Sequence, residues 1–173
     1  MQPIKADVLK YLSDARAHYA AYHNHKEVSA WAGVLLYVIF ATQIAFAPSE
    51  LLKTDAAVCS AYLLVVILWL VVLLYLYIQL DLRRWAANCI GAALLLGTEY
   101  LTKEQKDIKA EDWSLKDIPD AGHHSPHVLP KIVFDKAQEL DRKGHRARRW
   151  LEFAALAIVS ISFVAAVSRV WFR

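Results

Sequence analysis

Long runs of apolar residues without charge are the dominant pattern of this chain. The longest run covers residues 56–80 and a second run covers residues 28–47. Both lack Asp, Glu, Lys, Arg and His. A third run, residues 150–171, carries only Glu152 and Arg169, each close to one end. A helix rises about 1.5 Å per residue, so each run is long enough to cross a hydrocarbon core of roughly 30 Å. The pattern predicts an all-α integral membrane protein with three transmembrane helices.

A shorter apolar stretch, residues 85–98, follows Arg83 and Arg84 and ends before Glu99. It is too short to span a bilayer as a helix. We expect either a helix packed against other protein at the membrane surface or a re-entrant turn, with a fourth span as the alternative. A fourth span would place the basic residues of 142–149 outside, against the preference of Lys and Arg for the cytoplasmic side.

The distribution of Lys and Arg predicts the orientation. Four basic residues lie in residues 1–27, before the first span, whereas the connection 48–55 holds only Lys53. Since positive flanks stay in the cytoplasm, the N-terminus and residues 81–149 are expected inside and the loop 48–55 outside. With three spans, the C-terminus is then also expected outside.

The segment before the first span has helical periodicity. Apolar and aromatic positions recur in steps of three and four, and Leu12 and Tyr19 widen this stripe, which consists of Ile4, Val8, Tyr11, Ala15, His18, Tyr22 and His25. We expect residues 1–27 to form an amphipathic helix, continuous with the first span because no Gly or Pro separates them. Its stripe either covers residues 85–101 of the same chain or associates with another subunit.

The long segment 81–149 is expected to be mostly helical. Residues 99–118 are charged and predicted to be helical at first, and residues 119–130 form a loop rich in Pro and His. A short helix is expected after Pro130, with Val133, Ala137 and Leu140 on one face and Gly144 at its end.

Three histidines of the loop are the sharpest chemical cluster. His123, His124 and His127 could supply imidazoles to zinc or another transition metal. The alternative is that they order the loop through hydrogen bonds or titrate near neutral pH. No other cofactor is expected. The chain has neither a Gly-x-Ser-x-Gly motif, which would mark a nucleophilic serine, nor a glycine-rich phosphate loop. We therefore predict no catalytic residues.

The basic residues of the cytoplasmic segment have two interpretations. They could bind an anionic nucleotide or a lipid head group, or they could set the orientation of the third span against the anionic inner leaflet. The residues concerned are Arg83, Arg84, Arg142, Arg146, Arg148 and Arg149.

The spans hold few polar groups, and three helices cannot enclose a conducting path by themselves. A pore would have to form between subunits, lined by weakly polar side chains of the first and third spans: Thr42, Gln43, Ser160 and Ser162. The many small residues of the third span favour close helix packing, which suggests a homo-oligomer.

Composition agrees with a membrane protein. Hydrophobic residues make up 57% of the 173 residues and charged residues 21%. The two cysteines exclude a disulfide framework, and a net charge of +3 is too small to indicate a DNA-binding protein.

The layout resembles small bacterial membrane effectors of anti-phage defence systems. The resemblance lies in the helix that runs into the first span (AYHNHKEVSAWAGVLLY), the tight hairpin through Pro48, and the charged cytoplasmic segment with its arginines. It implies a protein of the bacterial inner membrane whose helices oligomerise and whose cytoplasmic part senses a nucleotide or a partner enzyme.

Three functions remain open from the sequence. The first is an oligomeric effector or sensor that forms a pore or otherwise disrupts the membrane, in which segment 81–149 receives a signal and shifts the packing of the spans. The second is a membrane anchor that recruits a cytoplasmic protein through its N-terminal helix and residues 99–149. The third is a metal-dependent membrane enzyme that uses the histidine loop.

Overall fold

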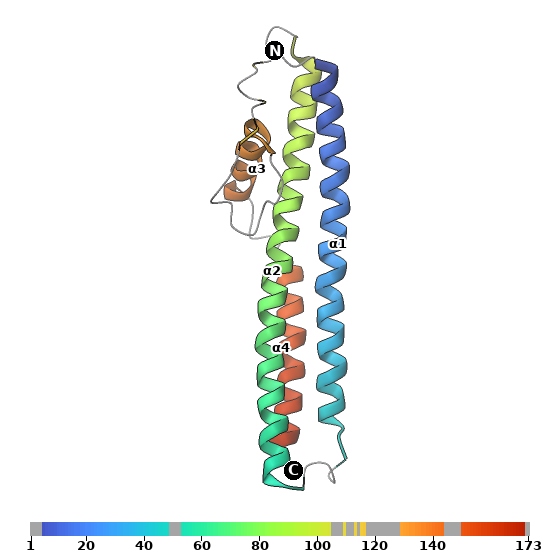
Figure 1. Ribbon diagram of the computed structural model, residues 1–173, viewed down its shortest axis with the longest axis vertical. Coiled ribbons are helices and arrows are strands. Elements are labelled where there is room, and N and C mark those ends of the chain that lie inside the picture. Colours follow the sequence, from blue (N-terminus) through green and yellow to red (C-terminus); the bar gives the residue numbers. More distant parts are fainter. Residues whose placement is uncertain are drawn as a thin grey trace. The chain divides into compact units, whose positions relative to one another are not determined.

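The computed structural model describes residues 5–48, 53–104, 109, 113, 115–116, 129–143 and 150–171. Four helices account for most of these residues (Figure 1): α1 (Lys5–Ala45), α2 (Asp55–Thr102), α3 (Lys131–Lys143) and α4 (Trp150–Trp171). Two short strands, β1 (Leu115–Lys116) and β2 (Leu129–Pro130), pair antiparallel, with Leu115 opposite Pro130. The prediction of an all-helical protein is confirmed, apart from this small sheet.

The first helix joins two predicted segments without a break. α1 runs from the N-terminal stretch through the first apolar run and ends at Ala45, three residues before Pro48. Proline disfavours helical geometry in the residue that precedes it, which explains why the helix ends here. As expected, no helix breaker lies at the junction near residue 28.

Of the two expectations for residues 85–98, the re-entrant turn is wrong, whereas a helix packed against other parts of the protein is found. This stretch lies inside α2, which continues over 48 residues from Asp55 to Thr102. The charges at Asp81, Arg83 and Arg84 interrupt the apolar run, but arginine is a good helix former and no proline occurs in this region. Charged residues therefore mark a change in the surroundings of the helix here rather than its end.

The chain divides into two compact units, and each unit consists of two separate parts of the sequence. Unit 1 contains Met1–Lys26 and Asp81–Arg146, and unit 2 contains Glu27–Leu80 and Ala147–Arg173. Helices α1 and α2 each contribute to both units, whereas α3 belongs to unit 1 alone.

Unit 2 is a bundle formed by the later part of α1, the earlier part of α2, and α4 (Figure 1). The Trp69 ring of α2 stacks on Phe163 of α4 at a centroid distance of 4.5 Å. Where α1 meets α2, the Tyr75 hydroxyl donates a hydrogen bond to the Ser29 carbonyl at 3.1 Å. Residues buried between the helices include Val34, Tyr37, Val65, Leu76 and Val159.

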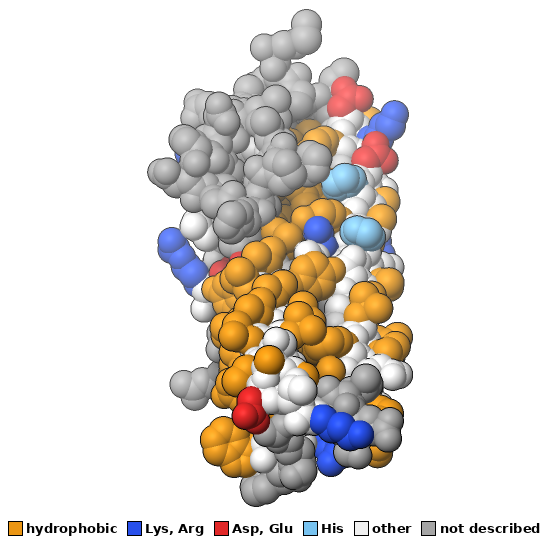
Figure 2. Space-filling view, turned by 60° about the horizontal axis from the view of Figure 1, so that its bottom comes forward, with side chains coloured by type: hydrophobic (Ala, Val, Ile, Leu, Met, Phe, Trp, Pro, Cys, Tyr) orange, Lys and Arg blue, Asp and Glu red, His pale blue; other side chains and the backbone are white. Residues whose placement is uncertain are grey.

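The outer surface of unit 2 is apolar as well. Large hydrophobic side chains are exposed along all three of its helices, among them Leu36, Tyr77 and Ile161, and Figure 2 shows such side chains gathered over one face. Three helices of the described chain are long and apolar enough to cross a membrane. In a bilayer this exterior would contact lipid rather than water.

Unit 1 has a core of its own. Val8, Leu12 and Tyr19 of α1 pack with α2 residues from Trp85 to Tyr100 and with the buried face of α3. The N-terminal stripe therefore covers residues 85–101 of the same chain, which was one of two expectations. His18 and His25, which the sequence placed on this stripe, are exposed. Leu12 and Tyr19 take the central positions because they offer more apolar surface than histidine.

The short helix α3 follows the prediction closely. It begins at Lys131, directly after Pro130, and ends at Lys143, directly before Gly144. Val133 and Ala137 are buried and Leu140 packs at the edge of the core, as the spacing predicts. Phe134 is buried too, against Trp85 of α2 at a ring-centroid distance of 5.6 Å.

Candidate functional site

A network of polar side chains joins α2 to α3 inside unit 1. The Asn88 side-chain amide donates a hydrogen bond to the Asp141 carboxylate, with 2.9 Å between Nδ2 and Oδ1. The Arg84 guanidinium approaches the same oxygen, with Nε at 3.6 Å, and also pairs with Asp81 one turn earlier on α2. Asn88 is the buried polar residue of the described chain. The Asp141 carboxylate therefore faces two donors of the neighbouring helix.

The spacing of these residues explains how the network forms. Positions 81, 84 and 88 are separated by three and four residues, so they lie on one face of α2. One turn further, Gly91 lets α3 approach closely: a Cβ added there would lie 3.1 Å from Leu140 Cδ1. Sequence reasoning identified Arg84 but not Asn88 or Asp141, because the partner helix follows in the sequence only after about fifty residues.

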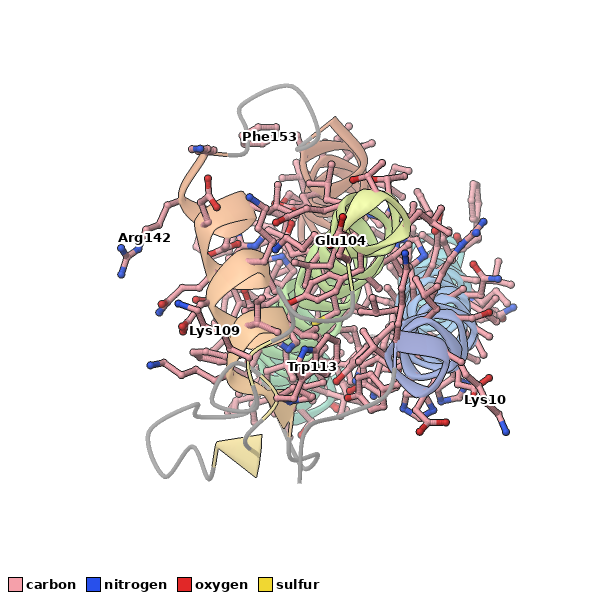
Figure 3. All side chains as sticks on the ribbon, turned by 90° about the horizontal axis from the view of Figure 1, so that it is seen from above. Lys10, Glu104, Lys109, Trp113, Arg142 and Phe153 are labelled. Carbon is pink, nitrogen blue, oxygen red and sulfur yellow. The ribbon has the colours of Figure 1, made fainter. Side chains whose placement is uncertain are left out.

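The arginines proposed for anion binding do not converge in the described part of the chain. Arg84 is flanked by two carboxylates, which would repel an incoming anion. Arg142 is exposed and points away from α2 (Figure 3). Arg83 is partly buried, and Arg146, Arg148 and Arg149 lie outside the described residues. An anion site on the arginines therefore stays a prediction.

The predicted metal site falls outside the structure's scope. His123, His124 and His127 lie among residues that the structure does not describe. Within residues 5–48, 53–104, 129–143 and 150–171, no group of three or more His, Cys, Asp and Glu is placed to hold a metal ion. A site on the histidine loop remains a prediction.

The polar residues proposed to line a pore lie on two helices of unit 2, α1 and α4. Thr42 and Gln43 are exposed on α1, and Ser160 is half-buried on α4. The Ser162 hydroxyl donates a hydrogen bond to the Ile158 carbonyl of its own helix at 2.8 Å. Such a bond satisfies a hydroxyl within apolar surroundings without a neighbouring helix.

Sequence reasoning missed three polar atoms in the interior of unit 2. Tyr37 Oη, Trp69 Nε1 and Gln79 Oε1 are buried, and none has a hydrogen-bond partner among the described residues. The signal available in the sequence was the presence of Tyr, Trp and Gln within otherwise aliphatic runs. Each such atom carries a desolvation cost in apolar surroundings.

A cysteine and a tyrosine meet in the core of unit 1. Burial raises the pKa of the Cys89 thiol to about 12, although hydrogen bonding with Tyr19 acts in the opposite direction. Burial likewise raises the pKa of the Tyr19 hydroxyl, and the neighbouring Cys89 adds to this effect. Both groups are therefore neutral at physiological pH, and Cys89 has the environment of a structural rather than a reactive cysteine.

Trp113 connects the segment after α2 to the core of unit 1. Its ring meets Tyr11 of α1 at 5.9 Å and Tyr100 of α2 at 5.5 Å between centroids, edge to face in both cases. In Figure 3, Trp113 points toward these two helices. The pattern analysis did not single out this residue, because an isolated tryptophan in a charged stretch gives no periodic signal.

Taken together, the described side chains form ion pairs, hydrogen bonds and aromatic contacts that fix helices to one another. In the network around Asp141, charged and amide side chains of α2 and α3 converge. A scan against protein-family models and searches of curated proteins and of solved structures found no match to this chain.

Proposed function

We propose that this chain is a bacterial inner-membrane protein that acts as an oligomeric effector or sensor without catalytic activity. Segment 81–149 would receive a signal in the cytoplasm, and the response would be a change in the packing of the spans that weakens the membrane barrier. The observation that carries this proposal is a contrast between the two units: large apolar side chains are exposed along all the helices of unit 2, whereas in the described part of unit 1 they are exposed at Leu94, Leu95 and Leu101 alone.

The shared helices support a coupled role for the two units. α1 and α2 each continue from one unit into the other without a break. A helix resists bending because each turn is hydrogen-bonded to the next. Repacking of α1 and α2 in unit 1 would therefore bias how the same helices pack in unit 2.

Induced expression in a bacterial host tests this proposal directly. We expect growth arrest, loss of membrane potential and uptake of a normally impermeant dye. A matched control is a variant with Gly33→Val, because a Cβ at this position would come within 2.8 Å of the Tyr75 ring and disturb the bundle of unit 2. Its membrane level must equal that of the unmodified chain. An intact membrane potential at high expression, together with a monomeric size in detergent, would exclude the effector role.

A second function is favoured by a separate observation. Three leucines of α2 are exposed within unit 1: Leu94 at 42%, Leu95 at 47% and Leu101 at 63%. Exposed leucines gathered on one helix are typical of surfaces that bind other proteins. They favour the anchor hypothesis, in which this unit recruits a cytoplasmic protein to the membrane.

Co-purification with the products of adjacent genes tests the anchor hypothesis. We expect a stoichiometric complex that survives detergent extraction and is lost in the variant Leu94→Ser/Leu101→Ser. The matched control is Ile161→Ser, which alters an exposed apolar residue of unit 2 instead. A complex that both variants retain would show that the leucines of α2 are not the binding surface.

A further inference from the structure

The two ends of helix α3 contact the rest of unit 1 in different ways, one through apolar and the other largely through polar side chains. Its first part is anchored in the core by Val133, Phe134 and Ala137, all of which are buried. Its last turn is exposed at Asp141, Arg142 and Lys143. Among the described residues, this turn meets α2 through Leu140 beside Gly91 and through the Asp141 carboxylate. The end of α3 that leads toward α4 thus depends largely on polar contacts.

The two polar contacts of Asp141, an ion pair with Arg84 and a hydrogen bond from Asn88, differ in how much they stabilise the last turn of α3. The side chains of Arg84 and Asp141 are 42% and 43% exposed, so water screens their attraction and this pair contributes little. The hydrogen bond from Asn88 contributes more, because Asn88 is buried and loses its acceptor if Asp141 moves away. The buried face of the first turns does not depend on either contact.

We propose that Asp141 is a releasable latch, which holds the last turn of α3 on Asn88 and Arg84 of α2 and whose opening regulates the spans. This inference rests on the proposed function, in which unit 1 relays a signal. Six residues separate the end of α3 at Lys143 from the start of α4 at Trp150. The last turn of α3 therefore lies close to α4 along the sequence, while the buried first turns keep α3 in the core.

Substitutions that remove or reverse the hydrogen bond between Asn88 and Asp141 provide the test. Asn88→Asp would place two carboxylates at the position of a 2.9 Å hydrogen bond and should open the latch. The double variant Asn88→Asp/Asp141→Asn reverses the bond, since the new amide donates and the new carboxylate accepts, and it should close the latch again. Asp141→Ala opens the latch without burying a new charge. Arg142→Gln is the matched control, because Arg142 belongs to the same turn but points away from α2 (Figure 3).

Hydrogen exchange of the full-length protein in detergent measures the opening. In Asn88→Asp and in Asp141→Ala we expect amides of residues 139–143 to exchange about tenfold faster, since a hydrogen bond to a charged group is lost. Amides of residues 133–137 should keep their protection, and the double variant should restore slow exchange. Unchanged exchange at 139–143, or an equal increase along the whole of α3, would overturn the latch.

Dye uptake separates the latch from the function on which it rests. Dye uptake that differs from wild type in Asn88→Asp and returns toward the wild-type level in the double variant supports regulation by the latch. Faster exchange without any change in uptake would overturn its regulatory role. A wild-type protein that never admits dye would instead refute the proposed function, and the exchange measurement would still decide whether the latch exists.

Discussion

The contact between α1 and α2 at Gly33 gives the sharpest prediction for unit 2. A Cβ added at Gly33 would lie 2.8 Å from Cε1 and 3.0 Å from Cδ1 of Tyr75. The ring has little freedom to yield in place, because its hydroxyl donates a hydrogen bond to the Ser29 carbonyl one turn earlier on α1. In Gly33→Ala the ring must therefore turn outward and give up that bond, or the helices must separate.

The expected change in the free energy of unfolding combines two destabilising contributions and one stabilising contribution. Overpacking costs about 1–3 kcal/mol and the lost hydrogen bond about 0.5–1.5 kcal/mol. The better helix propensity of alanine returns about 0.5–1 kcal/mol. Because Tyr75 is 37% exposed, its ring can rotate toward the surface, and this limits the cost of overpacking. We expect Gly33→Ala to lower the free energy of unfolding by about 1–2 kcal/mol.

Gly97 of α2 provides a matched control for this substitution. A Cβ at Gly97 meets nothing within 4 Å, so Gly97→Ala should show only the gain in helix propensity, about 0.5–1 kcal/mol. Both variants are compared with wild type by thermal unfolding of the purified protein in one detergent. Combination of Gly33→Ala with Tyr75→Ala should cost less than the sum of the two single changes, because the clash is absent. Equal stabilisation by the two alanines would refute the close approach of α1 and α2.

Three further predictions concern unit 1. Lys5 donates from Nζ to the carbonyl of Leu101 in the last turn of α2, at 2.9 Å, and to that of Lys103 just after the helix, at 2.8 Å. Lys5→Met should therefore speed hydrogen exchange of the final α2 turn without altering that of α3. The Cys89 thiol has a pKa of about 12, above the ordinary value of 9.0, so it should resist modification by maleimide at pH 8. Between about pH 9 and 12 the thiol ionises in the unfolded chain but not in the folded protein. The free energy of unfolding should therefore fall as the pH rises through this range. Rapid modification of the folded protein at that cysteine would contradict its burial. Hydrogen bonds from Lys143 and Lys136 lower the pKa of the Glu139 carboxyl group from 4.5 to about 2. Its ion pairs therefore contribute to the stability of the folded state above about pH 4.5, and this contribution disappears toward pH 2. NMR titration of the carboxyl group can follow the change.

Much of the helical architecture could be predicted from local pattern. Runs of uncharged residues identified the three apolar helices, and Pro130 with the spacing of Val133, Ala137 and Leu140 identified α3. The expectation of a re-entrant turn over residues 85–98 failed, because the helix continues past the charges that precede this stretch. Asp81, Arg83 and Arg84 are compatible with helical backbone, so only the absence of proline could have indicated that α2 continues to Thr102.

The candidate site was less accessible to sequence reasoning. Arg84 was noted for its charge, yet its role depends on Asp141, a residue that looks like any exposed acid in a short helix. Asn88 lies in an apolar stretch and carries no periodic signal, although a buried amide in such a stretch usually has a partner. Which side chain provides that partner depends on how α3 docks, and docking is a tertiary property.

The division of the sequence between the two units constrains how the protein is made. Each unit combines an early and a late portion of the chain, so neither is complete when the ribosome has produced only α1 and the first half of α2. The Trp69 ring, for example, can stack on Phe163 only after α4 has been synthesised. Premature termination before α4 would leave an apolar seam without its covering helix, a feature that cellular quality control recognises. Neither unit can be expressed as one contiguous fragment, and a soluble form of the first would require its two portions to be rejoined by an engineered linker.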